Sequence, residues 1–131
     1  MPQQEVEVIL MRHLASYLAV PIFVVDREGN LLFYNEPAEA LLGRPFDEAG
    51  EMPMAEWSTA FSPCDDDGRP LPPESLPLVI ALRRREPAHK AIRITGLDGV
   101  SRRIEIMAFP LMGQGDRVLG AAAMFWGVDG R

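Results

Sequence analysis

Residues 21–43 constrain the fold of this chain more than any other stretch of it. Two short runs, Ile22–Asp26 and Leu31–Asn35, are rich in β-branched and aromatic residues, which favour strands. The segment between them ends in Gly29 and Asn30, and both residue types tolerate a positive φ, so the stretch predicts a β-hairpin. Glu36–Leu42 then changes to a helical composition, which predicts that a helix follows the hairpin directly.

This expected helix carries a start signal and a stop signal. Asn35 can cap its first turn through the side-chain oxygen, and Pro37 suits the first helical positions. Gly43 can end the helix in the left-handed conformation. These signals together predict a compact strand-strand-helix unit.

The rest of the chain predicts further helices and strands. The helical segments repeat apolar residues at a spacing of three and four, whereas the strand segments are apolar runs bounded by turn residues such as Asp98-Gly99. Five strands with helices grouped in the middle of the chain indicate an α+β fold, one antiparallel sheet with helices on one face. We expect further helices over residues 6–18, 54–61 and 76–85, and further strands over 88–95, 101–110 and 118–126.

Length and charge limit the classes of protein and partner. A chain of 131 residues, 47% of them apolar, suffices for one domain with a real core. The formal net charge of −6 repels nucleic acid and anionic membrane, so we expect neither as a partner. The N-terminus lacks a signal-peptide pattern, and no apolar stretch reaches the ~20 residues that span a bilayer. We therefore expect a cytoplasmic protein.

The hairpin and the helix after it carry a recognisable sequence pattern. The hairpin reads D-x-x-G-x-(apolar)-(apolar)-x-x-N from Asp26 to Asn35, and the helix reads Ala38-Glu39-Ala40-Leu41-Leu42-Gly43. Both resemble the opening of PAS domains, particularly those of bacterial sensors. Residues 67–72 with Leu76-Pro77-Leu78 are similar to the segment that leads into the long helix of that family. The resemblance implies the PAS fold over residues 21–128, a five-stranded antiparallel sheet with helices on one face, after an N-terminal flanking helix over 1–20.

The resemblance also implies a role. PAS domains are sensor and signalling modules, so we expect this one to bind a small apolar ligand, a protein partner, or both. Many members end in Asp-(Ile/Val)-Thr, which couples the sheet to an effector, whereas residues 127–131 read Gly-Val-Asp-Gly-Arg. We therefore expect no effector domain in this chain, which either acts through partners or is a piece of a larger sensor.

Two alternatives to a ligand-binding sensor remain open. One is a ligand-free adaptor of the same fold that works through protein interaction and dimerisation. The other is a small α+β enzyme with an unrecognised site. No phosphate-binding loop, nucleophile elbow or Cys/His pair at metal spacing occurs in the sequence, so we expect no enzyme activity.

Strand alternation predicts which side chains face the helices. If the hairpin pairs as in PAS domains, this inner face is apolar and uncharged. Small residues such as Ala108, Ala121 and Ala123 leave space there, so the sequence predicts either a filled core or a cavity for an apolar ligand. The residues expected to line such a pocket are Phe23, Val25, Leu31, Phe33, Leu42, Leu76, Ile80, Ile92, Ile94, Ile104, Ile106, Ala108, Ala123 and Phe125.

Cofactor signatures of the family are missing. Flavin-binding members hold the ring with amide side chains on the last strands, whereas Ile94, Ile104 and Phe125 occupy the nearest positions here and cannot hydrogen-bond. Haem-binding members supply an axial histidine from the long helix, and residues 76–85 contain none. We therefore predict neither flavin nor haem, and at most an unidentified apolar small molecule.

Other reactive residues have simpler explanations. Cys64 is the only cysteine, and the acidic residues that follow it disfavour covalent attachment of a chromophore. Asp65–Asp67 are adjacent, whereas calcium loops space their ligands at alternate positions, so we expect a solvated turn and no metal. His13 and His89 are expected at the surface.

The outer face of the sheet also has an apolar pattern, since alternation places Ile22, Val24 and Leu32 there. A contiguous apolar face needs a cover, which favours a homodimer or a signalling partner. The N-terminal helix would pack on this face or against a second copy. The residues expected in the interface are Val8, Met11, Leu14, Ala15, Leu18, Ile22 and Val24.

Overall fold

A computed structural model describes residues 9–10, 13–14, 17, 19–45, 50–96 and 98–128. The helix expected over residues 6–18 stays a prediction, because much of it falls outside this range; Leu14, which is described, is exposed. Among the described residues, no helix is long and apolar enough to cross a membrane. The expected interface residues outside the described range are Val8, Met11, Ala15 and Leu18.

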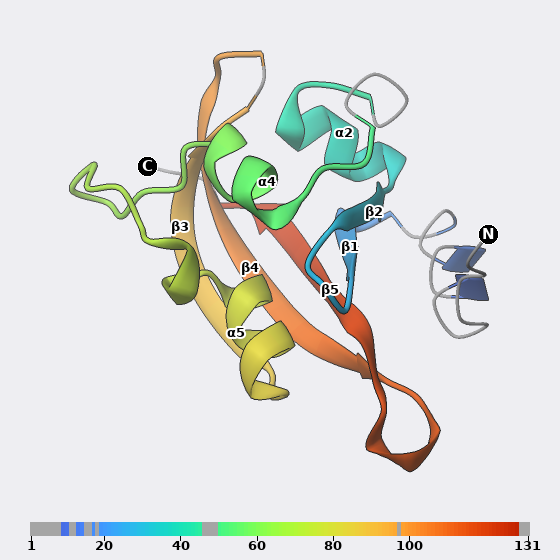
Figure 1. The fold of residues 1–131 in the computed structure, drawn as a ribbon. Coiled ribbons are helices and arrows are strands. Elements are labelled where there is room, and N and C mark those ends of the chain that lie inside the picture. Colours follow the sequence, from blue (N-terminus) through green and yellow to red (C-terminus); the bar gives the residue numbers. More distant parts are fainter. Residues whose placement is uncertain are drawn as a thin grey trace.

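The described chain forms a five-stranded sheet in the order β2-β1-β5-β4-β3, with every neighbouring pair antiparallel (Figure 1). This confirms the expected fold class. The first and last strands of the chain are therefore neighbours at the centre of the sheet. The strands are β1 (Ile22–Asp26), β2 (Leu31–Tyr34), β3 (Ala88–Thr95), β4 (Ser101–Met112) and β5 (Val118–Gly127).

Helices α2, α4 and α5 lie between β2 and β3 in the sequence, and α4 and α5 cover one face of the sheet (Figure 1). Helix α5 is shorter than expected, because Leu76 has an extended backbone and Arg85 adopts the left-handed conformation with φ of 58°. The α-helices are α2 (Glu36–Leu42), α4 (Met54–Ala60) and α5 (Pro77–Arg84), and the short 3-10 turns are η1 (Pro73–Ser75) and η2 (Gln114–Asp116).

Asn35 joins the hairpin to α2, as its predicted capping role requires. Its Oδ1 accepts hydrogen bonds from the backbone amides of Ala38, at 3.2 Å, and Ile22, at 3.0 Å. Its Nδ2 donates to the Val20 carbonyl at 2.9 Å. The side chain is 1% exposed, so one buried amide satisfies groups from both ends of the hairpin.

Gly43 ends α2 in the left-handed conformation, with φ of 83°. A Cβ on this glycine would also come within 2.6 Å of the Asp98 amide nitrogen, so α2 approaches the β3–β4 turn too closely for a side chain. Arg102 links the same parts, because its guanidinium donates to the Leu41 carbonyl at 2.9 Å and to Asp98 at 3.3 Å. The Val100 amide and the Arg102 guanidinium lower the pKa of the Asp98 carboxyl.

A β-bulge in the hairpin corrects the prediction for Phe33. Val25 pairs with Leu31, yet Val24 pairs with Phe33, so Leu32 is an extra residue in β2. An extra residue reverses the faces of those that follow it. Phe33 therefore packs on the outer face of the sheet, and the predicted pocket position was wrong; Tyr34 lies on the inner face instead.

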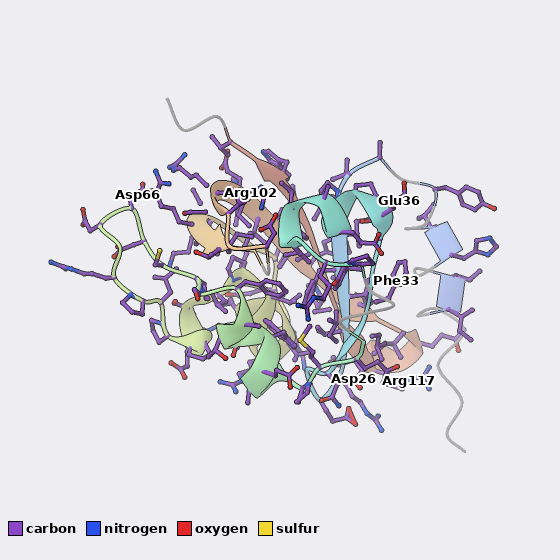
Figure 2. The ribbon with its side chains drawn as sticks, turned by 90° about the horizontal axis from the view of Figure 1, so that it is seen from above. Asp26, Phe33, Glu36, Asp66, Arg102 and Arg117 are labelled. Atoms are coloured by element: carbon purple, nitrogen blue, oxygen red, sulfur yellow. The ribbon has the colours of Figure 1, made fainter. Side chains whose placement is uncertain are left out.

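The sheet separates two apolar clusters. The larger lies on the inner face beneath the helices and includes Phe23, Val25 and Leu31. The smaller lies on the outer face around Ile22 and Val24, which are fully buried, with Phe33 packed against them. Both faces of one sheet are thus apolar. Figure 2 shows the molecule from above, with the charged side chain of Asp66 at the upper left and that of Asp26 at the lower middle of the view.

Candidate functional site

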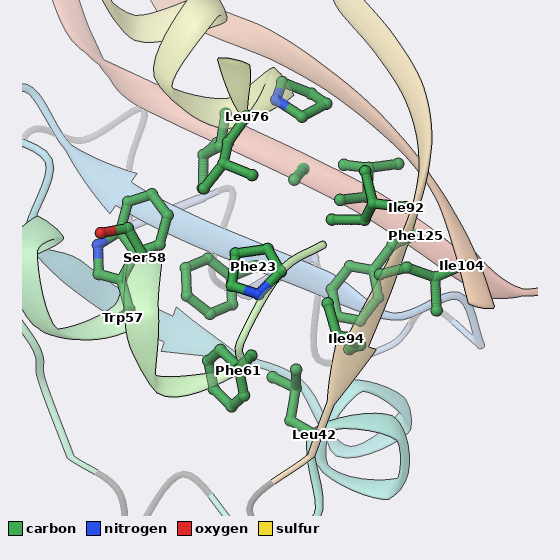
Figure 3. A pocket seen from close by; sticks show the side chains of 15 residues that line it. Phe23, Leu42, Trp57, Ser58, Phe61, Leu76, Ile92, Ile94, Ile104 and Phe125 are labelled. Atoms are coloured by element: carbon green, nitrogen blue, oxygen red, sulfur yellow. The ribbon is translucent and has the colours of Figure 1, made fainter. Parts of the chain in front are cut away.

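A cavity of about 80 Å³ lies between the inner face of the sheet and helices α4 and α5 (Figure 3). Side chains from β1, β3, β4 and β5 form its floor, and α2, α4 and α5 with their flanking segments form its walls. Apolar residues dominate this lining, as alternation on the inner face predicts. The residues expected at a pocket that do line the cavity are Phe23, Leu42, Leu76, Ile92, Ile94, Ile104, Ile106, Ala123 and Phe125.

The remaining expected pocket residues lie elsewhere. Val25, Leu31 and Ala108 belong to the inner core but do not line the cavity. Ile80 is half-buried and belongs to neither the core nor the lining. Leu76 and Ile80 were expected to point into the pocket from one face of a single helix. Leu76 instead has an extended backbone and precedes α5, so helical spacing does not place the two side chains together.

Sequence reasoning missed the wall that the irregular middle of the chain provides. Trp57 and Phe61 lie on one side of the cavity. They are four residues apart, and this helical spacing could have predicted that both side chains share one face. No local pattern marks the other missed positions, since tertiary packing alone brings them to the cavity. The lining residues that were not expected are Trp57, Ser58, Phe61, Pro63, Pro77 and Leu78.

Trp57 fixes α4 against the β1–β2 hairpin. Its Nε1 donates to the Gly29 carbonyl at 2.7 Å, so the one polar atom of the indole is satisfied away from the cavity. Its ring meets Phe23 edge-on, with centroids 5.5 Å apart and an interplanar angle of 67°. Such contacts stabilise buried aromatic pairs and hold this wall in place.

The segment 61–64 closes the cavity beside the edge strand β3. Thr95 donates its amide to the Phe61 carbonyl at 2.7 Å, and Cys64 and Arg93 exchange two backbone hydrogen bonds of 2.9 Å. Phe61 and Pro63 thereby lie over the cavity. This pairing also covers part of an edge that would otherwise expose backbone donors and acceptors.

The acidic loop after Cys64 makes a turn and two surface contacts. Asp65 accepts hydrogen bonds from the amides of Asp67 and Arg69, both at 2.9 Å. Asp66 lies 3.5 Å from the Arg93 guanidinium and 3.2 Å from that of Arg103. Within the described ranges, no group of three or more Asp, Glu, His or Cys residues is arranged to hold a metal ion.

The cavity is electrically neutral. Among the described residues that line it, none has an ionisable side chain, and Ser58 carries the only hydroxyl. The described histidines lie elsewhere, since His89 Nε2 is 3.0 Å from Glu105 on the exposed side of β3 and His13 stacks on Tyr17. The expectation that this protein binds neither flavin nor haem stays a prediction.

The described part of the expected dimer interface has mixed exposure. Leu14 is exposed, whereas Ile22 and Val24 are fully buried in the outer-face cluster. Exposed apolar side chains lie nearby on the same face, because alternation along β4 and β5 places Met107 with Phe109 and Leu111, and Trp126 with Met124.

Comparison with known families agrees with this geometry. A family model described as the PAS fold matches residues 9–125. The chain therefore belongs to the PAS family, whose members are sensory and signalling modules and generally not enzymes. A search of curated proteins found no match.

Solved structures of low sequence identity share the fold. The PAS domain of a Colwellia psychrerythraea protein has a TM-score of 0.66 at 21% identity and covers 95% of this chain and 99% of that one. The PAS domain of BvgS from Bordetella pertussis has a TM-score of 0.61 at 18% identity, covering 95% and 88%. The LOV protein of Rhodobacter sphaeroides has a TM-score of 0.72 at 11% identity, covering 96% and 70%. These likenesses show the fold alone.

Proposed function

We propose that this PAS domain is a sensor that binds a small, uncharged, largely apolar molecule in the cavity between the sheet and helices α4 and α5. The observation that carries the proposal is the cavity itself, whose lining is apolar and contains no ionisable side chain. Concave, mostly apolar pockets of this kind are the usual sites for small-molecule ligands.

The dimensions of the cavity limit the ligand. Engineered apolar cavities of about 150 Å³ stay dry and bind benzene. The volume here is about 80 Å³, so the ligand has a few non-hydrogen atoms, or the walls move to admit a larger one. A charged ligand is disfavoured, because its desolvation would be uncompensated in such a lining.

Strand β5 offers a physical route from ligand to signal. Ala123 and Phe125 line the cavity, whereas the alternate residues Ala122 and Met124 belong to the outer-face cluster. A ligand that displaces the inner side chains would therefore move the same strand that supports the outer face. Binding would shift the population between two arrangements of this strand and its outer partners.

Isoleucine methyl NMR tests the cavity. Methylenecyclopentane, an apolar probe of six carbons, should bind with an affinity on the order of 1 mM. The δ1-methyl signal of Ile9 serves as an internal reference, because this residue is exposed and does not line the cavity. The methyl signals expected to shift are those of Ile92, Ile94, Ile104 and Ile106.

A matched pair of variants completes this test. Ala123→Val adds two methyl groups inside the cavity and should weaken binding of the probe at least tenfold. Ala91→Val adds the same groups to β3 at a position that does not line the cavity, so its affinity should stay unchanged. Equal binding by both variants, or no shift of the cavity isoleucines, would sink the proposal.

A second candidate function is that of a dimerising adaptor. The observation that favours it is the outer face, where Met107 is 39% and Trp126 36% exposed beside the buried cluster around Ile22 and Val24. Apolar side chains that gather on one face mark interaction surfaces. The two functions are compatible, because they use opposite faces of the sheet.

A further inference from the structure

Among the described residues, one buried polar side-chain atom has no hydrogen-bond partner. It is Oγ of Ser58, a residue that is 3% exposed. A buried hydroxyl without a partner destabilises a fold, so its presence requires an explanation. Ser58 lies on α4 in the wall of the cavity, beside Trp57 (Figure 3).

The neighbouring residue shows that α4 itself can satisfy a hydroxyl. Thr59 Oγ1 donates to the Ala55 carbonyl at 3.1 Å, the bond that hydroxyl residues commonly make inside helices. Ser58 makes no bond of this kind. Trp57 does not satisfy it either, because its Nε1 donates to Gly29. Ser58 thus lines the cavity as a residue, while its hydroxyl oxygen is occluded and has no partner.

We propose that the Ser58 hydroxyl anchors the ligand by a hydrogen bond, and that the ligand carries one uncharged polar group on an otherwise apolar body. The inference rests on the cavity being the ligand site proposed above. In the structure Oγ presents almost no surface to the cavity. Rotation about the Cα–Cβ bond to another staggered position would bring it towards the polar group of an occupant. Ligand binding then supplies the partner that the unliganded protein lacks.

The surroundings of Ser58 define the chemical class. A hydroxyl donates one hydrogen bond and accepts others, so a carbonyl or an alcohol oxygen matches it. Every other residue of the lining is apolar or, like Trp57, has its polar atom engaged elsewhere. Small ketones, aldehydes and alcohols fit this environment. Carboxylates and amines do not, because no lining residue carries a compensating charge.

A pair of probes of the same shape tests the anchor. Cyclopentanone presents a carbonyl where methylenecyclopentane presents an apolar double bond. In Ser58→Ala, the affinity for cyclopentanone should fall about three- to tenfold, the usual effect of one neutral hydrogen bond. The affinity for methylenecyclopentane should change less than about twofold, since it makes no such bond. Affinities are measured by titration of the isoleucine methyl signals.

A control and a stability measurement complete the design. Thr59→Val removes the adjacent hydroxyl, which faces solvent, and should leave both affinities unchanged. The melting temperature of unliganded Ser58→Ala should be equal to or above that of the parent, because the removed hydroxyl has no partner. A lower melting temperature would mean that this hydroxyl has a structural bond, and would overturn the inference.

The outcomes separate the two proposals. If both probes bind the parent protein and Ser58→Ala weakens both equally or neither, the anchor is wrong and the ligand cavity stands. If neither these probes nor the smaller matched pair acetone and isobutene bind the parent protein, the ligand cavity is wrong and the anchor falls with it. Selective weakening of cyclopentanone supports both.

Discussion

Asn35 shows how one residue can hold several elements together. Its side chain caps α2, accepts the Ile22 amide at the start of β1 and donates to Val20. Only the cap follows from the local sequence. The contacts with residues 20 and 22 form because the hairpin returns the end of β2 to the start of β1. An asparagine suits this junction, because its one side chain both accepts and donates hydrogen bonds.

We expect Asn35→Ala to lower the free energy of unfolding by about 2–4 kcal/mol, because it removes a helix cap and leaves buried backbone groups unsatisfied. Urea unfolding followed by circular dichroism measures this change. Asn30→Ala is the control, since its side chain makes one part-buried bond of 3.3 Å to Asp26 and should contribute less than about 1 kcal/mol. Similar losses in both variants would contradict the bridging role of Asn35.

Among the elements, the segment 61–64 has the least support from sequence. It lies in an irregular stretch rich in proline and acidic residues, yet it pairs with the edge strand β3 and closes the cavity. No local pattern predicts such pairing, because its hydrogen bonds join residues about thirty positions apart. The bulge in β2 is similar, since both Phe33 and Tyr34 are aromatic and alternation alone does not decide between them.

Cys64→Pro tests this element. Proline removes the amide that donates to the Arg93 carbonyl, whereas Cys64→Ala keeps it. Hydrogen exchange should rise at least tenfold at the amides of Arg93 and Thr95 in the proline variant and stay near the parent rate in the alanine variant. If the proline variant protects both amides as well as the parent does, the segment does not depend on this pairing.

The sheet of this domain has two apolar faces, and they differ in how they are covered. The inner face is covered by the helices, and the outer face carries the partly exposed Met107 and Trp126. If the outer face is the interface of a homodimer, a charge placed on it will disfavour association. A charge at an equally exposed apolar residue in another part of the surface will have little effect.

We therefore expect the parent protein to dimerise, and Met107→Glu to weaken dimerisation at least tenfold, because a carboxylate would be desolvated in an apolar contact. Val100→Glu is the matched control, since Val100 is 47% exposed in the β3–β4 turn. Light scattering over a range of concentrations reports the mass of each variant. A parent protein that stays monomeric at high concentration would rule out the homodimer.

Elements whose signals are local follow from the amino-acid sequence alone. Turn chemistry and alternation act over a few residues. They predict the hairpin, the cap at Asn35, the stop at Gly43 and the inner positions of β3, β4 and β5. The family resemblance was carried by the same stretch, residues 21–43.

Features that depend on contact between distant segments are seen only in the folded chain. Three features are of this kind: the bulge that turns Phe33 outwards, the pairing of residues 61–64 with β3, and the unpartnered hydroxyl of Ser58. Residues 54–63 carry only a weak local pattern. Their conformation depends largely on packing against Phe23 and on pairing with β3. Burial and long-range pairing depend on the whole folded chain, whereas caps and turns depend on adjacent residues.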